Sequence, residues 1–196
     1  MRTHSADRLD PRAPLVLDLR DLPRSPGAQR ALHRVVPAPK DLGLELIHVA
    51  AGADLTLDLR LQSVTEGVYV SGRISGPLVG ECGRCLRTID DTVSVDLGEL
   101  FAYENSTTDE TTEEDEIGRV RDDLIDVEPA VRDAVVLALP QNPVCREDCP
   151  GMCPDCGVPW DELPADHGHD QLDSRWAALS KLSPSTDVDG PIDPEE

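Results

Sequence analysis

Hydrophobic and polar residues alternate through the middle of the chain. Leu55, Leu57, Leu59 and Leu61 are separated by Thr, Asp and Arg, which is the period of a strand with one buried face. Further runs with this period follow from residue 67 onward, and turn residues separate them. We therefore expect 43–103 to form four or five short antiparallel strands, as a sheet or a small barrel.

One segment has the period of a helix instead. Val131, Val135 and Leu139 are four residues apart, which places them on one helical face. Asp126 precedes this run and can cap it. The pattern predicts a helix over 127–139 whose apolar face packs on the sheet.

The remaining segments carry weaker patterns. Residues 14–20 indicate a short strand, whereas 22–40 are rich in Pro, Arg and Gly and predict irregular chain with one helical turn at 28–35. The Ser, Thr and acidic residues of 104–123 present no apolar face, which predicts a flexible loop. The fold class is therefore α+β, with one packing helix and a zinc-stapled C-terminal segment. We expect a single domain over 14–182, made of a β-rich part (43–103), an acidic loop (104–123), a helix (127–139), a Cys-rich segment (145–157) and a short helix (173–182), between a disordered N-terminus (1–13) and a disordered acidic tail (183–196).

Charge narrows the classes of partner. The 196 residues carry a net charge of -21 and only 3% aromatic residues, although the first 40 residues are net basic. An acidic body repels nucleic acid on average, so a basic protein partner suits it better. The N-terminus lacks the apolar core of a secretory signal, and no apolar run approaches the roughly 18 residues that a membrane span needs. These observations predict a cytoplasmic protein with no membrane partner.

Six cysteines form two groups that predict a zinc site. Two C-x-x-C pairs separated by a folded segment are typical of a four-thiolate zinc centre, and cytosolic cysteines stay reduced. We expect one structural zinc ion, for which Cys82, Cys85, Cys153 and Cys156 are the leading ligands. Two alternatives use the remaining cysteines: a local set of Cys145, Cys149, Cys153 and Cys156, and a set that joins Cys82 and Cys85 to Cys145 and Cys149.

The same residues argue against catalysis. Four thiolates close a zinc site, whereas catalytic zinc keeps one position open for water. The sequence around His167 and His169 resembles a metal motif, but its glycine and charges are more typical of an exposed loop. No phosphate-binding loop, nucleophile elbow or H-E-x-x-H motif occurs. We therefore expect no enzyme activity and no small-molecule substrate.

The order of these motifs resembles a known family. The motif at 80–86 (Gly-Glu-Cys-Gly-Arg-Cys-Leu) is followed by an acidic stretch and by a helix ending in Leu-Pro. The second motif then occupies 145–157 (Cys-Arg-Glu-Asp-Cys-Pro-Gly-Met-Cys-Pro-Asp-Cys-Gly), and a Trp-containing segment lies at 172–179. Together they resemble the bacterial YceD family of large ribosomal RNA subunit accumulation proteins, in a six-cysteine, actinobacterial-like form. The tip after the last cysteine, Val158 to Trp160, departs from the polar turn expected there.

The resemblance implies a cytoplasmic, non-enzymatic factor that supports accumulation or processing of large-subunit ribosomal RNA. Its expected partners are a precursor of the large ribosomal subunit or its RNA, and also a basic ribosomal protein. Arg84, Arg87, Arg30 and Arg34 are the candidates for local RNA contact. The alternative function is a thiol or zinc redox sensor, or a zinc-stabilised protein-interaction module.

Overall fold

The protein folds as a mostly antiparallel sheet with one helix packed on it. The computed structural model describes residues 9–113 and 117–169. The chain divides into two compact units, Met1–Gly151 and Met152–Glu196. The single domain over 14–182 stays a prediction. No helix among the described residues is long and apolar enough to cross a membrane.

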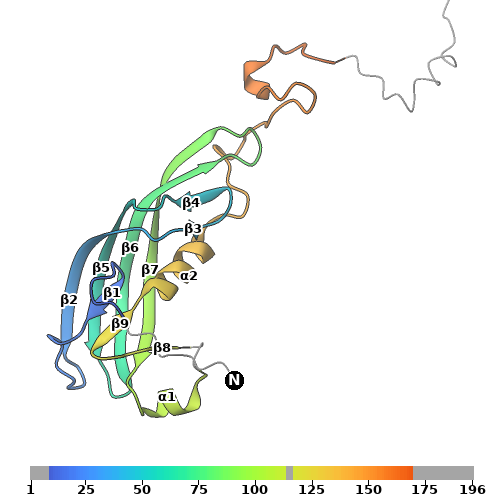
Figure 1. The fold of residues 1–196 in the computed structure, drawn as a ribbon. Coiled ribbons are helices and arrows are strands. Elements are labelled where there is room, and N and C mark those ends of the chain that lie inside the picture. The colour runs from blue at the N-terminus through green and yellow to red at the C-terminus, as the bar shows by residue number, and fades with distance from the viewer. Residues whose placement is uncertain (1–8, 114–116, 170–196) are drawn as a thin grey trace, which may run out of the picture. The chain divides into compact units, whose positions relative to one another are not determined.

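Strands supply most of the first unit, and the strands that we describe form two sheets (Figure 1). The larger contains β2 (Gln29–Pro37), β3 (Leu42–Gly43), β4 (Ile47–Val49), β5 (Asp54–Ser63), β6 (Gly67–Glu81), β7 (Thr88–Ala102) and β8 (Gly118–Arg119); the smaller pairs β1 (Val16–Asp18) with β9 (Leu124–Asp126).

A long hairpin is the centre of the larger sheet. Strands β6 and β7 pair along their whole length, from Gly67 opposite Ala102 to Glu81 opposite Thr88. The other edge of β6 pairs first with β5 and then, near its end, with β4. The only parallel pair among the described strands is β7 with β8. The first and last strands of the order do not pair, so the described strands form an open sheet. They do not form the small barrel that the sequence offered as an alternative.

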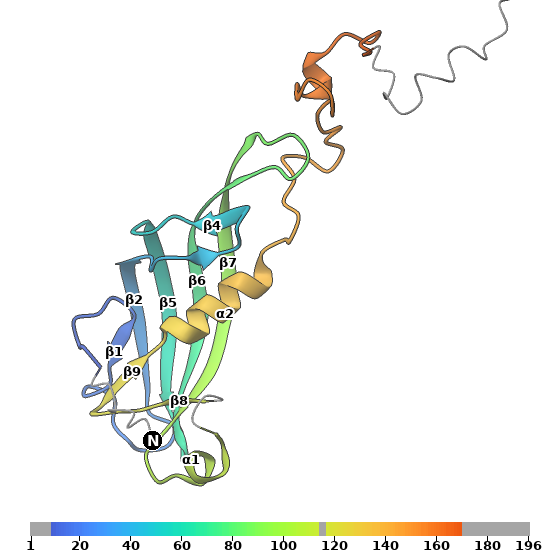
Figure 2. The same cartoon turned by 45° about the vertical axis from the view of Figure 1, so that its right-hand side comes forward.

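The core lies on one face of this sheet. The four alternating leucines of β5 are all buried, as are Val93, Val95 and Leu97 on β7. Helix α2 (Glu128–Ala138) covers that face and packs against β7 and β3 (Figure 2). Its buried residues Val131 and Val135 are those that the helical period predicted.

Two segments differ from the sequence prediction, and a third lies outside the described residues. Residues 28–35 were expected to include a helical turn but lie largely within β2, whose only buried residue is Val36. The described part of the acidic segment contains a short helix, α1 (Thr107–Thr111), and the strand β8. Ser106 caps α1 by accepting a hydrogen bond from the backbone of Asp109, so local capping orders a segment that has no apolar face. The predicted helix at 173–182 and the tail beyond it lie outside the described residues.

Candidate metal centre at the tip of the hairpin

The tip of the β6–β7 hairpin presents the first cysteine pair. Cys82 directly follows β6, and its backbone N–H donates to the carbonyl of Arg87 over 2.8 Å. The backbone N–H of Leu86 donates back to the carbonyl of Cys82 over 2.9 Å. Leu86 closes this turn in the left-handed region, with φ of 57°. The turn therefore fixes Cys82 and Cys85 at the end of two fully paired strands.

The chain that leaves α2 brings the second pair to the same place. The backbone N–H of Gly83 donates to the carbonyl of Pro143 over 2.8 Å, which ties the hairpin tip to the segment before Cys145. Gly151, with φ of 81°, faces the carbonyl of Arg84 at the end of this segment. Helix α2 thus carries the chain back to the hairpin tip and places Cys145 and Cys149 beside the first pair.

The four sulfurs have the spacing of a tetrahedral metal site. The Sγ atoms of Cys82 and Cys149 are 3.8 Å apart, those of Cys85 and Cys145 are 3.6 Å apart, and all four lie within 4.8 Å of one another. Four sulfurs at about 2.3 Å from one zinc ion would be about 3.8 Å apart, because the edge of a tetrahedron is about 1.63 times its centre-to-corner distance. The donor set therefore fits a closed zinc site, and we call these four residues the hairpin metal centre.

The surroundings already favour one thiolate. Burial raises the pKa of Cys82, but backbone N–H groups of Cys145, Arg84 and Cys85 outweigh this effect and lower that pKa to about 6. Cys145 is exposed overall, yet partial desolvation and the other three sulfurs raise its pKa to about 12. Four thiols this close cannot all ionise by themselves, so a bound dication is what would make all four thiolates stable together.

The same geometry bears on the redox alternative. Neither cysteine of the hairpin tip opens a helix, which is the position of the nucleophile in thioredoxin-like proteins. Cys82 is fully buried and Cys149 is 4% exposed, so most of the cluster is shielded from oxidants.

The structure groups the cysteines differently from the leading ligand set. The structure pairs Cys82 and Cys85 with Cys145 and Cys149, which is one of the two alternatives. Cys153 and Cys156 belong to the second unit, where they lie beside His167 and His169. The sequence interpretation missed these two histidines because it treated them as an exposed loop. Their signal was the H-x-H pattern, which begins eleven residues after Cys156.

The predicted RNA-contact arginines have structural partners. Arg84 Nη1 donates to the carbonyl of Cys149 over 2.9 Å, so this side chain holds the hairpin metal centre together. Arg30 and Arg34 donate to the carbonyls of Asp18 and Val16, which fastens β1 to β2. Arg87 contributes its carbonyl to the hairpin turn. These contacts do not gather the four arginines into one basic patch.

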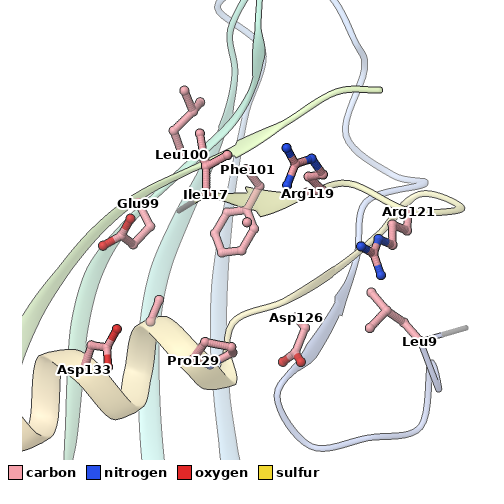
Figure 3. A pocket seen from close by; sticks show the side chains of 12 residues that line it. Leu9, Glu99, Leu100, Phe101, Ile117, Arg119, Arg121, Asp126, Pro129 and Asp133 are labelled. Carbon is pink, nitrogen blue, oxygen red and sulfur yellow. The ribbon is translucent and has the colours of Figure 1, made fainter. Parts of the chain in front are cut away.

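A cavity of about 430 Å³ lies between α2, β7 and β8 in the first unit (Figure 3). Its charged lining mixes acids and arginines, and Arg119 already pairs with Asp109. The lining includes no His, Cys or Ser, so its ionisable side chains are carboxylates and guanidinium groups. The full lining is Leu9, Glu99, Leu100, Phe101, Ile117, Gly118, Arg119, Arg121, Asp126, Pro129, Ala130 and Asp133.

Known proteins resemble this chain over most of its length. An uncharacterised protein of Mycobacterium tuberculosis (strain H37Rv) is 54% identical over 177 residues, which cover 90% of this chain and 85% of that protein. An uncharacterised protein of Mycobacterium leprae is 46% identical over 170 residues, covering 87% of this chain and 78% of that one. The uncharacterised protein YlbN of Bacillus subtilis is 32% identical over 110 residues, or 56% of this chain and 62% of YlbN. No solved structure matches significantly.

The family comparison covers the cysteine-bearing part of the chain. The family model described as "Large ribosomal RNA subunit accumulation protein YceD" matches residues 70–183. This range contains β6 from Val70 onward, all of β7 and α2, all six cysteines and both histidines of the second cluster. The resemblance noted in the sequence motifs is therefore confirmed, and the chain belongs to the YceD family.

Proposed function

We propose that this protein is a non-enzymatic factor in the biogenesis of the large ribosomal subunit, with a structural zinc ion in its hairpin metal centre. The observation that carries the proposal is the family match over 70–183, which includes every ligand of that centre. The family description names accumulation of large-subunit ribosomal RNA and no reaction. A closed four-thiolate site supports a structural role for the metal, because no position remains for a substrate or for water.

The surface around the metal centre supports a protein as the direct contact. Leu86 is 58% exposed at the hairpin tip, and Val144 is exposed nearby in the chain that follows α2. Exposed acids lie on the same two segments, among them Glu81, Asp91 and Glu147. Exposed apolar residues on segments that also carry exposed acids suit a basic protein partner. The partner that we propose is accordingly a basic ribosomal protein on a precursor of the large subunit.

The main test is depletion followed by sedimentation of ribosomal particles. We expect loss of large subunits and accumulation of precursor RNA, both restored by the wild-type chain. Cys149→Ser should fail to restore them because it removes a buried zinc ligand, whereas the exposed surface variant Arg73→Ala should restore them fully. Unchanged large-subunit levels after depletion would contradict the proposal.

The contact surface has its own test. Leu86→Asn removes the apolar side chain but keeps a residue that tolerates the left-handed turn, so the zinc content should not change. We expect this variant to lose its association with precursor particles. A salt titration then separates the classes of partner, since direct RNA contact gives a steep loss of affinity with rising salt. Steep salt dependence with purified RNA and an unaffected Leu86→Asn variant would place RNA, and not a protein, at this surface.

A further inference from the structure

The described part of the second unit, residues 152–169, has too little apolar core to hold its shape. Among these described residues only Cys153 is buried. The regular structure there is limited to a bridge between Met152 and Pro159 and the 3-10 turn Trp160–Glu162. Segments this small are normally held by a disulfide or a metal, and all six cysteines of the chain are free.

Four donors converge at the centre of this segment. Cys153, Cys156, His167 and His169 place one ligand atom each within 4.8 Å of the others. Cys156 Sγ and His167 Nε2 are 3.6 Å apart. A tetrahedral zinc ion with a sulfur at about 2.3 Å and a nitrogen at about 2.0–2.1 Å would hold them about 3.6 Å apart. The two imidazole rings stand nearly perpendicular, at 85°, with centroids 4.5 Å apart, so both can approach one ion without stacking.

The backbone holds the first two donors in a tight turn. The N–H of Gly157 donates to the carbonyl of Cys153 over 2.8 Å, and the N–H of Cys153 donates to the carbonyl of Val158 over 2.9 Å. Gly157 closes the turn with φ of 69°, a conformation that a side chain would strain. The two sulfurs of this turn therefore face one point before any metal binds.

The histidine side is held separately. The N–H of His167 donates to the carbonyl of Pro164 over 3.0 Å, and the Trp160 ring lies edge-on to the His167 ring at 5.7 Å between centroids. Trp160 is the residue at which the sequence departs from the polar tip expected for the family. Its indole packs beside one ligand of the cluster and thus orients that imidazole.

We propose that Cys153, Cys156, His167 and His169 bind a second zinc ion, so that each chain holds two. The two ligand sets share no residue, and each supplies four protein donors. Two thiolates with two imidazoles favour zinc over the hard cations, and four protein ligands make the site closed. The proposal does not depend on the role in ribosome biogenesis.

The test is a count of zinc per chain in untagged, full-length protein by elemental analysis and native mass spectrometry. We expect two zinc ions in the wild-type chain and one in His167→Ala/His169→Ala. Cys149→Ser should also retain one, and the triple combination none. His33→Ala is the matched control, because His33 is exposed and pairs with Asp58 outside both clusters, and it should retain two.

A second readout reports on the site itself. With Trp176→Phe as background, Trp160 is the remaining tryptophan, and zinc added to the metal-free chain should change its emission. The change should be absent in His167→Ala/His169→Ala and should return in His167→Cys/His169→Cys, which restores four soft ligands. The proposal is overturned by one zinc or none in the wild-type chain, or by two in the double-alanine variant. Its failure would leave the depletion phenotype untouched, so the two proposals can fail separately.

Discussion

Arg84→Ala is expected to weaken zinc binding at the hairpin metal centre while the sheet stays folded. Arg84 Nη1 donates to the carbonyl of Cys149 over 2.9 Å and lies 3.4 Å from that of Glu147. A hydrogen bond from a charged donor contributes about 1.5–3 kcal/mol, and we take the lower end because this residue is exposed. About 1.5 kcal/mol corresponds to a roughly tenfold rise in the dissociation constant of zinc.

The assay is competition for zinc with a chromophoric chelator. A His167→Ala/His169→Ala background leaves the hairpin metal centre as the only complete four-ligand cluster among the described residues. Arg84→Lys should lose part of the affinity, because an ammonium group is a point donor without the guanidinium fork. Arg73→Ala is the control, since Arg73 pairs with Asp96 on the exposed face of the sheet and should leave the affinity unchanged.

One result would refute this reasoning about Arg84. If Arg84→Ala binds zinc as tightly as the background chain but loses its association with ribosomal particles, the guanidinium contacts a partner. That outcome would restore the RNA-contact role that the sequence suggested for it.

Three further changes test the fold. Leu57→Ala removes a fully buried side chain on β5 and should lower the free energy of unfolding by about 3 kcal/mol. Leu137→Ala, at an 85% exposed position, should change it by no more than about 0.5 kcal/mol. Urea denaturation measures both values, and equal costs would mean that the sheet register is wrong. Asp126→Ala should cost about 1 kcal/mol in the same assay, because Asp126 Oδ1 accepts a hydrogen bond from the first backbone N–H of α2; no loss would mean that the helix begins elsewhere. The side-chain hydrogen bond from Arg20 lowers the pKa of Asp18 from 3.8 to about 2, so its stabilisation is present above pH 4 and is lost as the pH falls from about 4 to 2. Asp18→Asn should flatten that part of the acid unfolding curve, and an unchanged curve would count against the ion pair.

The sequence predicted the elements with strong periods. The leucines of β5 and the valines of α2 each repeat on one face, and both faces are buried as expected. Strand β2 lacked this signal because it is an edge strand: among the described strands it pairs with β5 alone, and it buries only Val36. Its two arginines and one proline therefore resembled irregular chain, although pairing with β5 holds it in the sheet.

The grouping of the cysteines in space could not be predicted from the sequence, for a topological reason. C-x-x-C spacing identifies which two cysteines share a metal, but not which distant pair joins them. That choice depends on where α2 ends relative to the tip of the β6–β7 hairpin, which the contact between Gly83 and Pro143 fixes. His167 and His169 were missed because the neighbouring glycine and acids are typical of an exposed loop. Their H-x-H spacing indicates a metal site only when Cys153 and Cys156 have no other cysteines beside them.

The pairing of β1 with β9 has a consequence for the order in which the chain can fold during synthesis. Val16 lies opposite Asp126, so the first strand emerges early and has no partner until most of the first unit has been made. The β6–β7 hairpin, by contrast, pairs residues that are close in sequence, so it can form before the rest of the unit has been made. The proposed zinc site at Cys82 and Cys85 likewise lacks ligands until Cys149 has been made. Zinc held by all four cysteines of the hairpin metal centre would thus show that translation has passed residue 149.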